Sequence, residues 1–235
     1  MKKLLTITAM IMTSQAFAMK EIPLDQQIGE IITIETTGTK NRSNQIVEDQ
    51  PQQPQKKDNV EETRKIISIT RDMIALGEAW YELVKKGKPS NVTEYSAISV
   101  VPRDQNKEYV DPFELEGFSV PVERSFTTKI TNGTGKEVVR FDYTVIYSFG
   151  GSYRGAGRYL TNVMIVPKNI KTTFGWDFNA TMKLNGIMNH GSKDQPVAGA
   201  MVAIKYQMSS WSVSFERNDV IHVTGNGELK SYGIK

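Results

Sequence analysis

Hydrophobic residues recur at alternating steps of three and four between residues 60 and 87. The six positions of this stripe are Ile66, Ile69, Met73, Leu76, Trp80 and Leu83. This spacing places apolar side chains on one face of an α-helix. Asn59 and Glu62 form a capping-box pattern before the stripe, and Gly87 followed by Pro89 is typical of a helix end. The pattern predicts one long amphipathic helix over 60–87 that packs on a sheet.

Beyond that segment the hydrophobic period changes from 3.6 to 2. Alternation is unbroken over 139–149 and again over 174–184, as is typical of strands with one buried face. Further candidate strands are 95–101, 124–131, 159–166, 197–208, 211–216 and 220–224. We therefore expect a mostly β protein, in which residues 93–235 form an antiparallel, jelly-roll-like β-sandwich preceded by the one long amphipathic α-helix.

The first 18 residues have the three parts of a secretory signal peptide. Lys2 and Lys3 precede an apolar stretch over residues 4–12, and Ala16-Phe17-Ala18 matches the small-residue cleavage pattern. The apolar stretch is much shorter than the roughly 18–20 residues that span a bilayer. We expect cleavage of residues 1–18, an exported protein that is periplasmic or extracellular, and no transmembrane helix in the mature chain.

Residues 19–59 are expected to form a flexible N-terminal segment. Residues 41–59 include two prolines and five glutamines but only two aliphatic residues. Such a composition cannot bury enough apolar surface to offset the loss of chain entropy on folding. Upstream of it, the β-branched stretch 28–36 is a candidate edge strand, whose partner the sequence does not identify.

Composition narrows the classes of function. The sequence has no cysteine, which excludes disulfides, thiolate zinc sites and cysteine nucleophiles. Loss of the two signal lysines would lower the formal net charge from +3 to +1, so nucleic acid is not an expected partner. His190 and His222 are the only histidines, too few for a multi-histidine metal site. We expect no enzymatic activity, no cofactor and no metal.

The glycine-rich stretch 149–159 is the main candidate for ligand binding. Its glycines leave backbone N–H groups accessible, while its arginines and tyrosines supply anion-binding and stacking groups. The candidate residues are Ser152, Tyr153, Arg154, Arg158 and Tyr159. Phosphate, sulfate or a sugar would suit such a site. A turn between two long strands would account for the same glycines without a ligand.

A second candidate is the stretch 186–194, which offers Asn189, His190 and Asp194. The sequence favours an ordinary solvated connection as the explanation of these residues. His222 alternates with Val220 and Thr224 and is expected on the surface of a strand. If the two candidate stretches serve one ligand, they should lie at the same end of the sandwich.

These features favour an exported, non-catalytic binding or structural module of the bacterial envelope. The expected partner is a glycan, a lipid headgroup, anionic in particular, or an envelope protein.

Two other classes of function remain open. An amphipathic helix ahead of an aromatic-rich sandwich is similar in layout to the actinoporin-type pore-forming toxins. That likeness implies membrane permeabilisation by the helix 60–87, with peripheral membrane contact. A hydrolase would instead need Asp142, Asp177, Glu216 or Asp219 to converge on one cleft.

Overall fold

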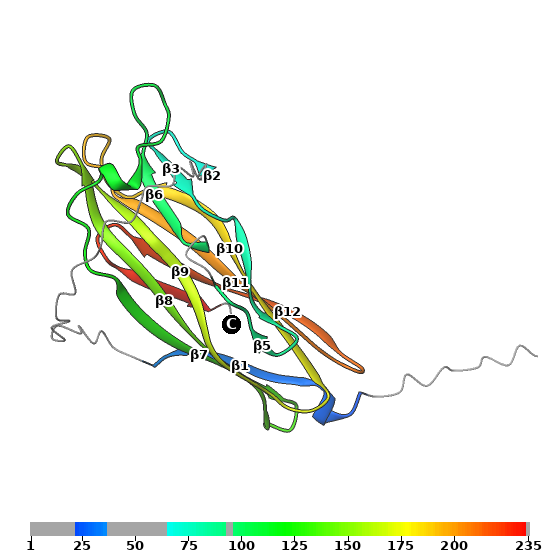
Figure 1. Ribbon diagram of the computed structural model, residues 1–235. Helices are drawn as coiled ribbons and strands as arrows, with labels where there is room; N and C mark the ends of the chain where they lie inside the picture. The colour runs from blue at the N-terminus through cyan, green and yellow to red at the C-terminus, as the bar shows by residue number, and fades with distance from the viewer. Residues whose placement is uncertain (1–21, 37–64, 93–95, 234–235) are drawn as a thin grey trace, which may run out of the picture.

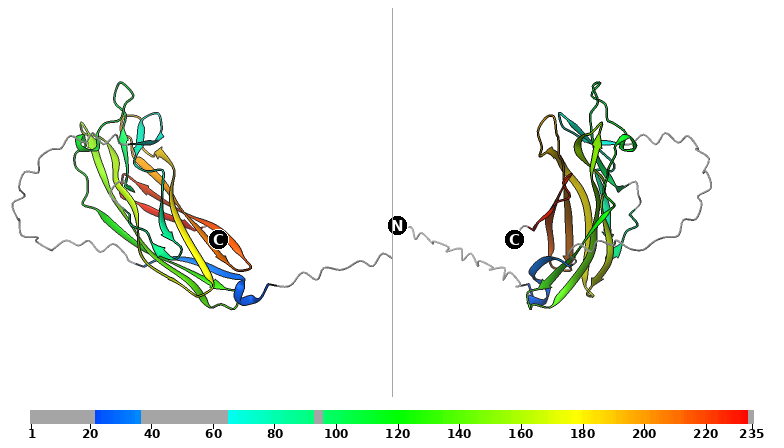
Figure 2. Two further views of the ribbon diagram at one scale, coloured as in Figure 1. Left: turned by 45° about the vertical axis from the view of Figure 1, so that its right-hand side comes forward. Right: turned by 90° about the vertical axis from the view of Figure 1, so that its left-hand side faces the viewer.

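The computed structural model describes residues 22–36, 65–92 and 96–233, which form two antiparallel β-sheets stacked face to face (Figures 1 and 2). The prediction of a mostly β sandwich is thereby confirmed. The predicted signal peptide 1–18 and the polar segment 41–59 lie outside the described residues. No helix in the described part of the chain is long and apolar enough to cross a membrane.

One sheet has seven strands and the other has six. The order in the first is β1 (Ile28–Glu35), β7 (Val122–Asn132), β8 (Glu137–Tyr153), β9 (Ala156–Thr172), β6 (Ile98–Pro102), β3 (Met73–Leu76) and β2 (Ile66–Ile69). The order in the second is β13 (Leu229–Gly233), β12 (Ser214–Thr224), β11 (Ala198–Ser210), β10 (Trp176–Asn189), β4 (Trp80–Lys85) and β5 (Lys88–Pro89). Short 3-10 turns are η1 (Leu24–Gln26) and η3 (Pro112–Glu114).

The strand order differs from that of a jelly roll. Strands β7, β8 and β9 follow one another as antiparallel neighbours, and so do β10 to β13. A jelly roll is instead built from two Greek keys, whose fourth strand returns beside the first. The finer prediction of a jelly-roll-like order is therefore wrong, and the sandwich is built largely from hairpins.

Aromatic side chains fill the space between the two sheets. Phe141 on β8 and Phe178 on β10 are both fully buried, and their ring centroids lie 5.7 Å apart. Phe178 also stacks on Tyr206 of β11, at 6.0 Å. The alternating residues of the two best strand patterns thus meet across the sandwich, because each sheet can remove its apolar face from water only against the other.

The prediction of a long helix over 60–87 is wrong for the described part, 65–87. This part forms β2 and β3 in the seven-stranded sheet and β4 in the six-stranded sheet. These strands begin at residues 66, 73 and 80. A strand and its turn thus occupy seven residues, the same length as two helical turns, and repeat the apolar spacing of a helix. The predicted stripe is split in space: Ile69 and Trp80 are exposed, whereas Met73 and Leu83 are fully buried.

Gly77 marks the turn that carries the chain from β3 towards β4. Its φ of +135° favours glycine, and a Cβ there would lie 2.5 Å from the Ala97 carbonyl oxygen. In a helix over 60–87 the same glycine would be an unfavourable interior residue. Its backbone conformation instead permits the close approach of the loop before β6.

Strand β1 lies at the edge of the seven-stranded sheet, where it pairs with β7. It is also bound to the opposite sheet through β12. Thr33 Oγ1 donates a hydrogen bond of 2.6 Å to Asp219 Oδ2, and Arg217 Nη1 donates one of 3.1 Å to the Ile31 carbonyl. Arg217 and Asp219 form an ion pair of 3.1 Å, in which the Asp219 side chain is fully buried. The N-terminal strand therefore joins the two sheets.

Replacing Asp219 with alanine should strongly destabilise the sandwich. Asp219→Ala leaves Arg217 and Thr33 without their shared acceptor, and breaking a buried ion pair costs about 3–5 kcal/mol. Chemical denaturation measures the loss in the free energy of unfolding. Asp177→Ala, at an exposed position on β10, is the control and should change that free energy by no more than about 0.5 kcal/mol. Similar small losses in the two variants would contradict a joining role for Asp219.

Candidate functional site

The β8–β9 and β10–β11 hairpins have their tips at the same end of the sandwich (Figure 1), and hydrogen bonds join them to each other and to the β12–β13 connection. The Arg158 amide donates to the Pro196 carbonyl at 2.8 Å, and the Gly157 amide donates to Gln195 Oε1 at 3.2 Å. Arg158 Nη1 donates to Asn226 Oδ1 at 2.9 Å, in the connection between β12 and β13. We call residues 150–158, 189–197 and 225–228 the loop end. The two stretches that the sequence singled out are thus neighbours.

Most of the glycine-rich stretch belongs to the β8–β9 hairpin. Strand β8 continues to Tyr153, which pairs with Ala156 at the start of β9. The turn consists of Arg154 and Gly155, with φ of 51° and 75°, as a two-residue type I′ turn requires. The Arg154 guanidinium lies 5.0 Å from the centroid of the Tyr153 ring. The hairpin tip therefore presents a stacked cation and aromatic ring.

Tyr159 is a core residue and not part of an accessible site. Its side chain is 3% exposed, and its ring occupies the space beside Gly157, where a Cβ would come within 2.5 Å of ring atoms. Burial, followed by the charge of Asp72, raises the pKa of Tyr159 from 10.0 to about 12. Its direct neighbour Leu160 is also fully buried, and the pairing of β9 with β6 shifts register just beyond it, so the burial of Tyr159 does not follow from simple alternation.

Tyr159→Phe should make folding less sensitive to alkali. The raised pKa keeps Tyr159 neutral in the folded chain. The contribution of this neutral side chain to the free energy of unfolding is complete below pH 10.0 and is lost as the pH rises to about 12. Between these values the unfolded chain loses its proton first, which favours unfolding. Thermal melts across this range should therefore show a smaller fall in stability for Tyr159→Phe than for the wild type. An equal fall in both would show that Tyr159 ionises as readily in the folded chain as in the unfolded one.

Ser152 and Asn189 chiefly hold the backbone of the loop end. Ser152 exchanges two backbone hydrogen bonds, of 2.8 and 2.9 Å, with Glu116. Asn189 Oδ1 accepts hydrogen bonds from the amides of Gly191 and Val197, at 2.8 and 2.9 Å. Asp194 lies on the exposed loop between Gly191 and Val197. Of the predicted binding residues, Tyr153 and Arg154 therefore best fit direct contact with a ligand.

The two histidines of the chain meet at the loop end. The Nε2 atoms of His190, after β10, and His222, on β12, lie 3.0 Å apart, and the ring centroids are 4.8 Å apart. Partial burial lowers the pKa of His222, as do the nearby His190 ring and the Lys230 ammonium group. Sequence reasoning placed each histidine alone, because their meeting depends on how β10, β11 and β12 align.

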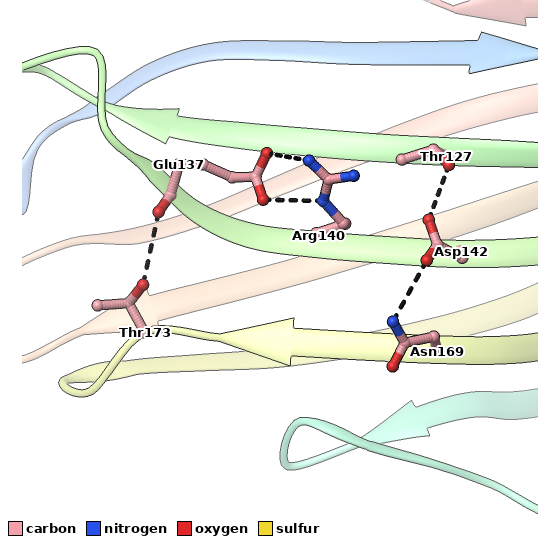
Figure 3. A network of polar contacts seen from close by, with 6 residues as sticks. All are labelled: Thr127, Glu137, Arg140, Asp142, Asn169 and Thr173. Atoms are coloured by element: carbon pink, nitrogen blue, oxygen red, sulfur yellow. Dashed lines mark hydrogen bonds and ion pairs between the residues drawn. The ribbon is translucent and has the colours of Figure 1, made fainter.

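The carboxylates considered for a hydrolase lie on different surfaces. Asp142, on the outer face of β8, accepts hydrogen bonds from Thr127 Oγ1 at 2.7 Å and from Asn169 Nδ2 at 3.4 Å (Figure 3). Asp177 and Glu216 are exposed on the six-stranded sheet, and Asp219 is buried against β1. Asp142 therefore serves a cross-strand network, and the four do not share a cleft.

Glu137 belongs to the same outer face of the seven-stranded sheet. It forms a bidentate pair with Arg140, with both hydrogen bonds at 2.9 Å (Figure 3). That hydrogen bonding lowers the pKa of Glu137. Among the described residues, no three His, Cys, Asp or Glu side chains lie close enough together to hold a metal ion.

An open pocket lies away from the predicted sites, beside β4. Its volume is about 590 Å³, and its lining includes Lys65, Glu78, Trp80 and Asn91. Trp80 is 61% exposed; the helix prediction concealed this by assigning it to an apolar stripe. The pocket is open to solvent, unlike sites that bury most of a small ligand.

Comparison of the chain with protein-family models, with curated proteins and with solved structures found no match. The function must therefore be inferred from the residues themselves.

Proposed function

We propose that this protein is an exported, non-catalytic binding module of the bacterial envelope that binds an anionic glycan at the loop end. The observation that carries the proposal is the stacked pair of Tyr153 and Arg154 at the tip of the β8–β9 hairpin. Export rests on the signal pattern in residues 1–18. The absence of catalysis is supported by the separate surfaces of the four carboxylates considered for a hydrolase.

The hairpin tip suits an anionic sugar for two physical reasons. A guanidinium group that lies over an aromatic ring keeps its N–H edges free for bidentate contact with a sulfate, phosphate or carboxylate group. The aromatic ring is partly buried against the core, so it gives the guanidinium that lies over it a fixed support. The short turn between two 17-residue strands fixes both groups, which reduces the entropy lost when a ligand orders them.

Neighbouring residues support the tip. Arg158 is held by Asn226 through its side chain and by Pro196 through its backbone, so it contributes positive charge from a fixed position. Lys193 adds another cation on the adjoining loop, beside the acidic Asp194. The mixture favours discrete contacts with a ligand over a broad electrostatic field.

The membrane-permeabilisation hypothesis depended on the predicted helix 60–87, which the structure does not contain in its described part, 65–87. The hypothesis required residues 60–87 to detach as a helix, but β2, β3 and β4 lie within this range, and β3 and β4 contribute fully buried side chains such as Met73 and Leu83. Withdrawal of these strands would expose the core. The likeness in layout to actinoporin-type toxins ends with the helix, and we do not propose that function.

The paired substitution Tyr153→Ala, Arg154→Ala should abolish glycan binding without unfolding the protein. Calorimetry with sulfated or phosphorylated oligosaccharides measures the affinity, with neutral dextran and phosphatidylglycerol vesicles as comparisons. A ligand present at 100 times its dissociation constant should stabilise the wild type by about 2.7 kcal/mol, and this gain should vanish in the variant because both contact groups are removed.

The matched control is Lys168→Ala, Lys171→Ala, which removes exposed charge towards the far end of β9. It should bind as the wild type does. Loss of binding in the control, with retention in the tip variant, would contradict the proposed location. Binding to vesicles but not to oligosaccharides would identify a lipid headgroup as the ligand, contrary to the proposal.

A further inference from the structure

The paired imidazoles lie on the outer face of the six-stranded sheet, above β11. A Cβ placed on Gly199 would come within 2.5 Å of His190 Nε2 and 2.9 Å of His222 Nε2. Both nitrogens therefore lie directly over this glycine. Any larger residue on the outer face of β11 at this point would displace the rings, so glycine provides the space in which they meet.

Each histidine is held by its own strand or loop. The His190 amide donates to the Val197 carbonyl at 2.8 Å, and Asn189 fixes the turn that leads into it. His222 belongs to the continuous β11–β12 ladder. The approach of the two nitrogens is therefore a consequence of backbone register and not of two freely moving surface side chains.

Two methionines flank the same glycine. Met188 on β10 is the direct cross-strand partner of Gly199, and Met201 on β11 is that of His222. Direct partners in an antiparallel pair share a face and have Cβ atoms about 4.5–5.5 Å apart. Gly199 and Met201 share that face because they are two residues apart. Both methionines are partly exposed, so the patch combines two imidazoles with two thioethers.

The separation of the imidazole nitrogens suits two ligands of one metal ion. Nitrogens bound at about 2.0–2.1 Å with tetrahedral bond angles lie roughly 3.3–3.4 Å apart. The two rings share a hydrogen bond of 3.0 Å, so a separation of a few tenths of an ångström, with loss of the shared proton, would let both nitrogens bind one ion. The flexible methionine side chains can then bring sulfur to the remaining positions.

We infer that His190, His222, Met188 and Met201 form a binding site for copper(I). Thioether sulfur selects soft ions such as copper(I), and imidazole also binds copper well. Hard divalent ions such as calcium and magnesium need several oxygen ligands, whereas the four side chains of this patch offer nitrogen and sulfur. The inference concerns a metal that sequence analysis did not expect and does not depend on glycan binding.

Copper(I) binding can be measured anaerobically by competition with a chromophoric copper(I) chelator. We expect one copper ion per chain and, by X-ray absorption, both nitrogen and sulfur in the first coordination shell. His222→Gln should weaken binding by at least about tenfold, as loss of a ligand costs no less than loss of its support. Gly199→Ala should do the same, because its methyl group displaces both rings while leaving all four ligands present.

The methionines are tested by Met188→Leu, Met201→Leu. This variant should bind copper(I) more weakly, lose the sulfur signal and keep its thermal stability. The matched control is Met164→Leu, a partly exposed methionine on β9 of the other sheet, which should bind as the wild type does. Absence of stoichiometric binding in the wild type, or undiminished binding in His222→Gln and Gly199→Ala, would overturn the site. Zinc(II) binding tighter than copper(I) would overturn the role of the methionines.

Discussion

The burial of two opposed apolar faces is the constraint on which this structure depends. Each long strand alternates between inward aromatic or aliphatic side chains and outward polar ones. Neither sheet can therefore bury its apolar face without the other sheet. Phe141, Phe178 and Tyr206 pack against one another across the interior. Because this packing fixes both the faces and the register of the strands, it also fixes where their connections emerge. The packing of the core therefore determines the position of the loop end.

The outer surfaces follow from the same alternation. Once the inward positions of β10, β11 and β12 are assigned to the core, Gly199 and His222 must face outward. A register shift of one residue would reverse these faces. The buried pair of Arg217 and Asp219 adds a polar connection at the β1 edge. The candidate sites therefore depend on a rigid framework, although they lie at its surface.

The sequence predicted the long strands well and the short ones poorly. In β8 and β10 the period of two persists for many residues, and no helix reproduces it. In β2, β3 and β4 each strand has only four to six residues, too few to establish a period. Their seven-residue spacing then imitated a helix, and the turn at Gly77 gave a weak local signal against it.

The candidate site shows the same division. Tyr153 and Arg154 could be identified from sequence because a two-residue turn and its neighbours are local. The meeting of His190 with His222 could not, since the two are 32 residues apart and meet only through the alignment of three strands. The burial of Tyr159 could not be predicted either, because Tyr159 and the adjacent Leu160 are both buried beside a register shift of β9.

The most direct test of the account is backbone NMR of the mature protein during titration with a sulfated oligosaccharide. Saturable shifts of amide resonances in 150–158 and 189–197 would place the ligand at the loop end, where the structure brings these stretches together. Saturable shifts confined to residues near the β9–β10 turn at the opposite end, with none at the loop end, would contradict the central claim that the loop end is the binding surface.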